Sequence, residues 1–142
     1  MAHVQVVVEQ VGPSTSKGTV RTHSVLIDRP AAKGGADRGP MGGEYLLLAL
    51  GGCFMSNLLA AARAREAMIS DARVGVSGTF EGTPERVTAF TLNVSATCHD
   101  REMLSKLVTI AERACIVANT LREVGPISIV LEAASTGETV NA

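Results

Sequence analysis

A run of eighteen residues without a single charge, from Tyr45 to Ala62, constrains this chain more than any other feature. Leu, Ala and Met make up most of the run, and these residues favour helices, so we expect one helix here. Its apolar residues go all the way round the helix, whereas a surface helix shows one apolar stripe. We therefore expect this helix to be covered on every side, by its own sheet and by a second subunit.

The same run is long enough to cross a membrane, so that interpretation has to be weighed. The polar or flexible residues Gly51, Gly52, Ser56 and Asn57 make it a poor span. Strand-like segments on both sides also need a soluble sheet in which to pair. We favour a buried core helix, and extraction into the soluble fraction without detergent would decide.

The length of 142 residues predicts one domain, 1–142, with a core built from Val, Leu, Ile and Ala because aromatic residues make up only 3%. A net charge of −1 and the lack of a basic tract disfavour binding to nucleic acid or to anionic lipid. The N-terminus lacks the features of a secretory signal, so we expect a cytoplasmic protein.

The residue pattern predicts both strands and helices. Five β-rich segments are expected to be strands: His3–Val11, Thr19–Ile27, Arg73–Glu81, Val87–Thr97 and Ile127–Leu131. A second helix is expected from Arg101 to about Val124, with Asp100 as its N-cap. The tail, 133–142, is expected to fray. This mixture predicts an α+β fold.

Three cysteines, Cys53, Cys98 and Cys115, make a disulfide framework improbable in a reducing compartment. Cys53 lies in the charge-free helix, and helical spacing turns Cys115 inward on the second helix. A thiolate that attacks a peroxide becomes a sulfenic acid, which a nearby thiol can resolve as a disulfide. The alternative is that Cys53 and Cys115 are small core residues. Spacing alone leaves both open, and Cys98 is read as incidental.

Other chemistry has little support in the sequence. The adjacent Cys98 and His99 lack the companion ligands of a zinc site, and no glycine-rich phosphate-binding motif is present. His23 is read as an ordinary strand residue rather than a catalytic base. The Gly- and Pro-rich loop 28–43 is either a solvated connection or a loop that folds over the helix start and brings a guanidinium to the thiol.

Two motifs resemble those of the OsmC/Ohr superfamily of osmotically inducible and organic hydroperoxide resistance proteins. Gly39-Pro40, followed by the segment from Glu44 to Cys53, resembles its first cysteine motif. The segment 111–117, with Leu121 downstream, resembles its second. The resemblance implies an OsmC-like fold, with strongly curved antiparallel sheets around two main helices and two chains intertwined as a homodimer.

The resemblance also implies a thiol-dependent peroxidase with Cys53 as the peroxidatic thiol and Cys115 as the resolving thiol. It implies no bound cofactor or metal, and an external dithiol reductant such as dihydrolipoamide. An apolar wall predicts alkyl or lipid hydroperoxides as substrates; its members are Leu46, Leu50, Phe54 and Met55. The alternatives are a protein that binds an apolar ligand in the same pocket, or a redox sensor without catalytic turnover.

The chain departs from the best-understood peroxidases of the family at the glutamate, and no motif identifies its activating arginine. Their glutamate ten residues before the first cysteine is replaced by Gly43, and Glu44 lies nine residues before Cys53, as in a side branch of OsmC-like proteins. Nine helical steps turn the chain by about 180°, so Glu44 would face away from the thiol unless it serves across the dimer or the helix begins late. We expect Arg29 or Arg38 to hold the thiolate, because a cation favours that form.

Overall fold

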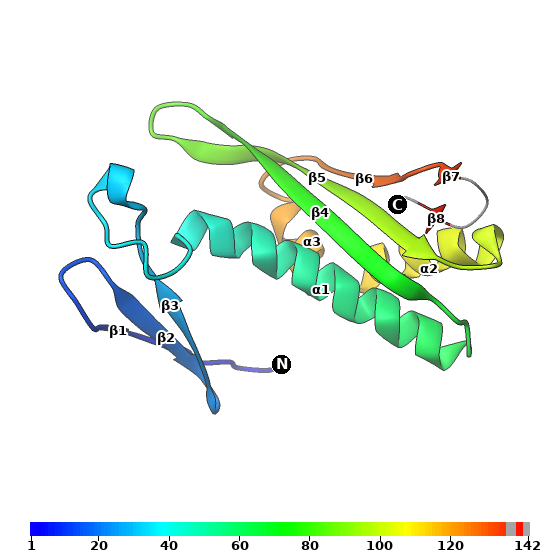
Figure 1. Ribbon diagram of the computed structural model, residues 1–142, viewed down its shortest axis with the longest axis horizontal. Coiled ribbons are helices and arrows are strands. Elements are labelled where there is room, and N and C mark those ends of the chain that lie inside the picture. Colours follow the sequence, from blue (N-terminus) through cyan, green and yellow to red (C-terminus); the bar gives the residue numbers. More distant parts are fainter. Residues whose placement is uncertain (136–138, 141–142) are drawn as a thin grey trace. The chain divides into compact units, whose positions relative to one another are not determined.

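The computed structural model describes residues 1–135 and 139–140, in two compact units, Met1–Leu46 and Leu47–Ala142 (Figure 1). The first unit is an antiparallel three-stranded sheet. Its strands, in spatial order, are β1 (Val7–Gln10), β2 (Ser16–Val20) and β3 (His23–Ile27). The expected first strand is therefore confirmed in its C-terminal half.

The expected single strand Thr19–Ile27 is wrong, because the chain turns back inside it. Arg21 and Thr22 form the turn that separates β2 from β3. Arg21 has φ of 55°, in the left-handed region that residues other than glycine seldom adopt. No Gly, Asn or Pro marks this turn, so the residue pattern concealed it.

Helix α1 (Gly42–Ala64) confirms the helix expected from the charge-free run. Its first turn belongs to the first unit and is fixed there by two side chains. The Oε1 atom of Glu44 accepts a hydrogen bond from the backbone N–H of Met41 at 2.9 Å. The hydroxyl of Tyr45 donates to the carbonyl of Leu26 on β3 at 2.7 Å. The sequence therefore starts the helix with its own capping group and an anchor to the sheet.

The second unit contains a sheet centred on a long antiparallel pair, β4 (Ser70–Glu81) and β5 (Arg86–Thr97). Strand β6 (Ile127–Leu131) lies parallel to β5. The three strands expected here are confirmed. Strand β4 begins at Ser70, before the expected Arg73, and its pairing register shifts between Ser70 and Arg73.

Two short strands, β7 (Ala134–Ser135) and β8 (Thr139–Val140), complete this sheet, with β8 antiparallel to β5. Both fall within the tail 133–142 that we expected to fray. Residues 136–138 and 141–142 of that tail lie outside the described part of the chain.

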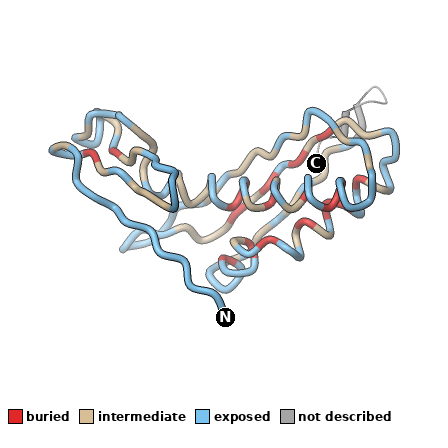
Figure 2. Tube along the Cα trace, turned by 90° about the horizontal axis from the view of Figure 1, so that it is seen from below, coloured by how far each residue is buried: buried red, intermediate tan, exposed pale blue. Residues whose placement is uncertain are grey.

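Helices α1 and α2 (Arg101–Ala114) cover the same face of the sheet in the second unit. A Cβ atom added to Gly51 of α1 would lie 2.8 Å from Val76 on β4, and Leu104 of α2 packs against Ala96 on β5. Val76 pairs with Leu92, which shares a strand face with Ala96. The buried apolar residues gather between these layers (Figure 2); the large fully buried ones are Leu50, Phe54, Leu58, Phe90, Leu92, Val94, Leu104, Leu107 and Cys115.

By length and composition α1 could cross a membrane, which is weak evidence by itself. Leu50, Phe54 and Leu58 have no exposed surface, because this face of the helix packs in the core. The opposite face is open in the single chain, where Leu48 is 59% and Leu59 45% exposed. The prediction that the chain's own sheet covers α1 is confirmed for one face.

The second helix is broken, and the expected continuous helix from Arg101 to Val124 is wrong. It ends at Ala114 and restarts as α3 (Ile116–Leu121), with Cys115 extended between them at φ −73° and ψ 106°. Asp100 is the N-cap of α2, as expected, and accepts a hydrogen bond from the Met103 N–H at 3.0 Å. Helical spacing continues through Cys115, so periodicity gave no sign of the break.

Candidate active site

The thiols of Cys53 and Cys115 face each other in the core of the second unit. Cys53 is half-buried on α1, and Cys115 has no exposed surface at the break between α2 and α3. Burial raises the pKa of the Cys115 thiol, hydrogen bonds from the backbone of Ala118 and Val117 offset part of that rise, and the adjacent Cys53 thiol adds to it. Cys115 is therefore a neutral thiol at pH 7, beside a more accessible partner.

The break in the helix positions Cys115. Its Sγ atom accepts a hydrogen bond from the Ala118 N–H at 3.4 Å and so caps α3. A residue in an extended conformation between two helices can adjust its side chain without breaking an intrahelical ladder. The sequence thus places the thiol at a joint rather than within a rigid helix.

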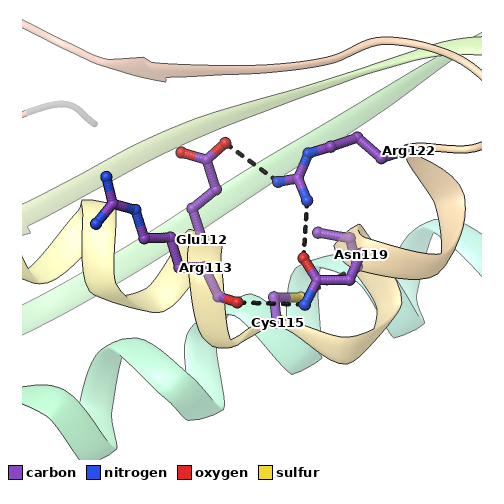
Figure 3. Close-up of polar contacts among 6 residues, drawn as sticks. Glu112, Arg113, Cys115, Asn119 and Arg122 are labelled. Carbon is purple, nitrogen blue, oxygen red and sulfur yellow. Dashed lines mark hydrogen bonds and ion pairs between the residues drawn. The ribbon is translucent and has the colours of Figure 1, made fainter.

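Polar side chains bridge this joint on its outer side (Figure 3). The Nη2 atom of Arg122 lies 3.2 Å from Oε2 of Glu112, which joins the end of α3 to α2. Arg122 also donates to Asn119 at 2.8 Å, and the Asn119 amide donates to the carbonyl of Arg113 at 3.2 Å. These contacts hold the two helices together around Cys115.

Asn57 is a polar neighbour of Cys53 that the sequence analysis noted only as unfavourable for a membrane span. Its Nδ2 atom donates to the Cys53 carbonyl at 2.9 Å and lies 3.8 Å from the Cys53 sulfur. The signal was available in the sequence, because residues four apart on a helix lie on the same face. An amide one turn after the cysteine, in an otherwise apolar run, was the clue.

The residues expected to form an apolar substrate wall divide into two groups. Leu50 and Phe54 have no exposed surface, because they lie on the face of α1 that packs in the core. Met55 in the second unit and Leu46 in the first are half-buried. Their role in a substrate pocket stays a prediction.

The arginines proposed to hold the thiolate, Arg29 and Arg38, lie in the first unit on the loop that precedes α1. Both flank the buried carboxylate of Asp28, which accepts hydrogen bonds from the Arg29 N–H at 2.7 Å, the Arg38 N–H at 3.2 Å and the Thr15 hydroxyl at 2.8 Å. Asp28 therefore fixes the backbone of this loop at Arg29 and at Arg38. The action of Arg29, Arg38 or Glu44 on Cys53 stays a prediction.

Burial alone would raise the pKa of Asp28, but hydrogen bonds from Thr15, the backbone of Arg29 and Arg38, and Ser14 outweigh it and hold the pKa well below its ordinary value. The carboxylate is thus charged at neutral pH. The sequence analysis missed Asp28. An aspartate at the end of a β-branched strand, before a Gly- and Pro-rich loop, was the available signal.

An apolar cavity of about 280 Å³ opens on the sheet of the first unit. It is lined by strand residues and by the start of α1: Val6, Val8, Gly18, Thr19, Val20, His23, Ser24, Val25, Ile27, Gly42 and Tyr45. His23, expected to be an ordinary strand residue, begins β3 and contributes to this wall.

Cys98 lies apart from the cysteine pair, after the end of β5. Its Sγ atom donates to the Asp100 carbonyl at 3.3 Å, and its side chain packs beside Ala96 and Leu104. This position gives it a structural contact at the start of α2.

Residues 34–130 match the sequence model of the family described as OsmC-like protein. The chain belongs to this OsmC family. The match includes both cysteine motifs and extends from the loop before α1 to strand β6. No curated protein sequence matches the chain significantly.

Solved structures of other OsmC proteins share the fold of this OsmC-like chain. An OsmC-like protein from Mycoplasma pneumoniae has a TM-score of 0.78 at 16% identity, with 91% of this chain and 95% of that chain covered. An organic hydroperoxide resistance protein OsmC from Legionella pneumophila has a TM-score of 0.70 at 14% identity, with 91% and 96% covered. The organic hydroperoxide resistance protein OhrB of Bacillus subtilis has 0.65 at 19%, with 90% and 96% covered. At these identities the likeness shows the fold.

Within the described residues of this OsmC-like chain, no cluster of three or more His, Cys, Asp or Glu side chains could hold a metal ion. All three cysteines are free thiols. The paired thiols can ionise, be oxidised and take part in disulfide exchange.

Proposed function

We propose that this protein is a cytoplasmic, homodimeric, thiol-dependent peroxidase that reduces organic hydroperoxides. The contact between a half-buried Cys53 and a fully buried Cys115 is the observation that carries the proposal. Membership in the OsmC family, whose solved relatives include organic hydroperoxide resistance proteins, supports it.

We assign the two thiols different roles because they differ in exposure. Cys53 attacks the distal oxygen of the hydroperoxide as a thiolate: the S–O bond forms, the O–O bond breaks, and the alkoxide leaves as the alcohol after taking up a proton. Sulfur is oxidised to a sulfenic acid, and the peroxide is reduced. Cys115, buried and neutral, is poorly suited to make this first attack.

Cys115 then attacks the Cys53 sulfur. The S–S bond forms, the S–O bond breaks, and the hydroxide leaves as water with the proton of the Cys115 thiol. An external dithiol, for which dihydrolipoamide is our candidate, returns two electrons and reopens the disulfide. The position of Cys115 at the joint between α2 and α3 supports this step, because the resolving sulfur can approach without unwinding a helix.

The test counts free thiols and measures intact mass after one equivalent of an organic hydroperoxide, followed by peroxide consumption with excess dithiol. We expect the loss of two thiols as a Cys53–Cys115 disulfide and rapid turnover, with alkyl hydroperoxides consumed faster than hydrogen peroxide. The Cys98→Ser variant should behave like the wild type. Unchanged thiols in a folded protein would rule out the peroxidase.

The apolar cavity on the first unit favours a second candidate, a protein that binds an apolar ligand without turning peroxide over. In that case a variant with serine at both Cys53 and Cys115 would retain an apolar fluorescent probe, and the wild type would consume no peroxide. A disulfide that forms once without turnover would instead indicate a redox sensor.

A further inference from the structure

Asn57 follows Cys53 by one turn of α1 and contacts it twice. The Asn57 Nδ2 atom lies 2.9 Å from the Cys53 carbonyl oxygen and 3.8 Å from the Cys53 sulfur. A carbonyl oxygen can only accept a hydrogen bond, so the NH₂ group of the amide, rather than its oxygen, must face Cys53. The amide orientation therefore follows from the chemistry of its backbone partner.

An amide NH₂ group carries two hydrogens, and one hydrogen bond to the carbonyl leaves the second free. The sulfur lies within reach of that second hydrogen. A hydrogen bond to an ionised acceptor is roughly twice as strong as one to a neutral acceptor, so the contact favours the thiolate over the thiol. Both side chains are half-buried, which limits competition from water for the sulfur.

The residue type at this position is otherwise unfavourable. Asn is among the weaker helix formers, because its side chain competes for backbone groups, whereas Leu and Ala fill most of α1. Where Leu58 and Phe54 turn into the core, Asn57 turns to the sulfur. A donor to Cys53 accounts for an amide at this point of the helix.

We propose that Asn57 is a catalytic residue that donates a hydrogen bond to the Cys53 sulfur, stabilising its thiolate before attack and the sulfenic oxygen after it. The inference rests on the proposed function in taking Cys53 as the attacking thiol. Cys115, at the break between α2 and α3, is the titratable group that faces Cys53, and it supplies no negative charge while it is a neutral thiol.

The test measures the rate of Cys53 alkylation by iodoacetamide against pH, read at the Cys53 peptide by mass spectrometry in the full-length protein. Asn57→Leu keeps the approximate size and removes the donor, and Asn57→Asp places a carboxylate beside the sulfur. We expect the alkylation rate at pH 7 to fall about tenfold in Asn57→Leu and further in Asn57→Asp, with the midpoint of the pH profile moved upward. Ser56→Ala, at the neighbouring exposed position, is the matched control and should follow the wild type.

A profile in Asn57→Leu that coincides with the wild type would overturn the proposal. If the Leu or Asp variant does not fold, as judged by circular dichroism, Asn57→Ser carries the test, since its hydroxyl is too short to span the same distance. Alkylation needs no peroxide, so this result is separate from the proposed function. That function fails on its own if wild-type protein keeps all its thiols when treated with hydroperoxide.

Discussion

At the scale of single residues, the two thiols differ in exposure and in the groups that contact them. Cys115 has no exposed surface, and its pKa is raised by burial and by the Cys53 thiol beside it. Cys53 keeps part of its surface open and has the Asn57 amide beside its sulfur. The pairing was expected from the family resemblance, whereas spacing alone left it open. The contact with Asn57 was not predicted, although its place one helical turn after Cys53 was a signal for it.

The first prediction separates the two steps of the proposed reaction. In Cys115→Ser the attack on peroxide remains but the resolving thiol is gone, so one equivalent of organic hydroperoxide should leave a sulfenic acid at Cys53. A dimedone adduct at the Cys53 peptide, found by mass spectrometry, is the measurement. Cys98→Ser should give the disulfide and no adduct. An adduct at Cys115 in the Cys53→Ser variant, formed as fast, would reverse the assignment of roles.

The second prediction concerns the buried carboxylate of Asp28. Its pKa is lower in the folded protein than in the unfolded chain, so the stability that it supplies is present above the unfolded value of about 3.9 and is lost as the pH falls below it. We expect Asp28→Asn to lower Tm at pH 7 by several degrees, because an amide cannot accept all the hydrogen bonds from Thr15, Arg29 and Arg38. The deficit should shrink towards pH 2.

Melting curves at several pH values would measure this, with Asp37→Asn as the control on the same loop. An equal loss of Tm at pH 7 and pH 2 would contradict the prediction, because the carboxylate's charge would then have no part in it. If Arg29 or Arg38 of this loop also holds the Cys53 thiolate, Asp28→Asn should slow peroxide turnover as well.

At the scale of elements, the close approach of α1 to β4 depends on one glycine. A Cβ atom at Gly51 would lie 2.8 Å from Cγ2 of Val76, whereas a Cβ at Gly52 meets no atom of the chain within 4 Å. Val76 is β-branched and stiff, so it cannot easily move aside. The two adjacent glycines therefore differ in their surroundings. Gly51 allows α1 to lie close to β4, whereas Gly52 has no neighbour within this chain.

The third prediction compares these two positions. Gly51→Ala should lower the free energy of unfolding by about 1 kcal/mol, since overpacking of about 1–3 kcal/mol exceeds the gain in helix propensity. Gly52→Ala should raise it by roughly 1 kcal/mol through helix propensity, when both glycine variants are compared in the monomeric Leu59→Lys background. Chemical denaturation of both variants is the measurement. Adding Val76→Ala should remove the penalty at Gly51, and a penalty that survives this change would mean that another contact causes it.

Sequence patterns located the elements well where an apolar period ran uninterrupted, as in α1, β5 and β6. They failed at two joints, the turn at Arg21 and the break at Cys115. Arg21 takes a left-handed backbone without a glycine, and Cys115 breaks a helix while keeping its helical spacing. In both cases the backbone conformation is determined by pairing and packing with distant residues, which local propensity does not include.

At the scale of the whole molecule, α1 offers more apolar surface than one chain covers. Leu48 and Leu59 are eleven residues apart, which is about three turns, so they lie on one face, with the small residues Gly52 and Ser56 between them. Small residues allow a second helix to approach closely. The sequence predicted that a second subunit would cover this face, and the open surface of the single chain supports a homodimer as a proposal.

The fourth prediction tests this surface. Leu59→Lys should shift the protein from dimer to monomer, since a lysine would be buried unpaired at the interface. Light scattering after size-exclusion chromatography is the measurement. Val130→Lys is the matched control, because Val130 on β6 has the same 45% exposure, and it should leave the mass unchanged. A monomeric wild type would contradict the proposal.

The cap that Cys115 places on α3 ties the covalent state of sulfur to a single amide proton. In the reduced protein the Ala118 N–H is held by the Cys115 sulfur at 3.4 Å. A disulfide sulfur is a poorer acceptor that is also turned towards Cys53, so oxidation should break this hydrogen bond. Hydrogen exchange at Ala118, followed by NMR, should then be faster in the oxidised protein than in the reduced one. The exchange rate of this one amide would report the fraction of the protein that is in the disulfide form.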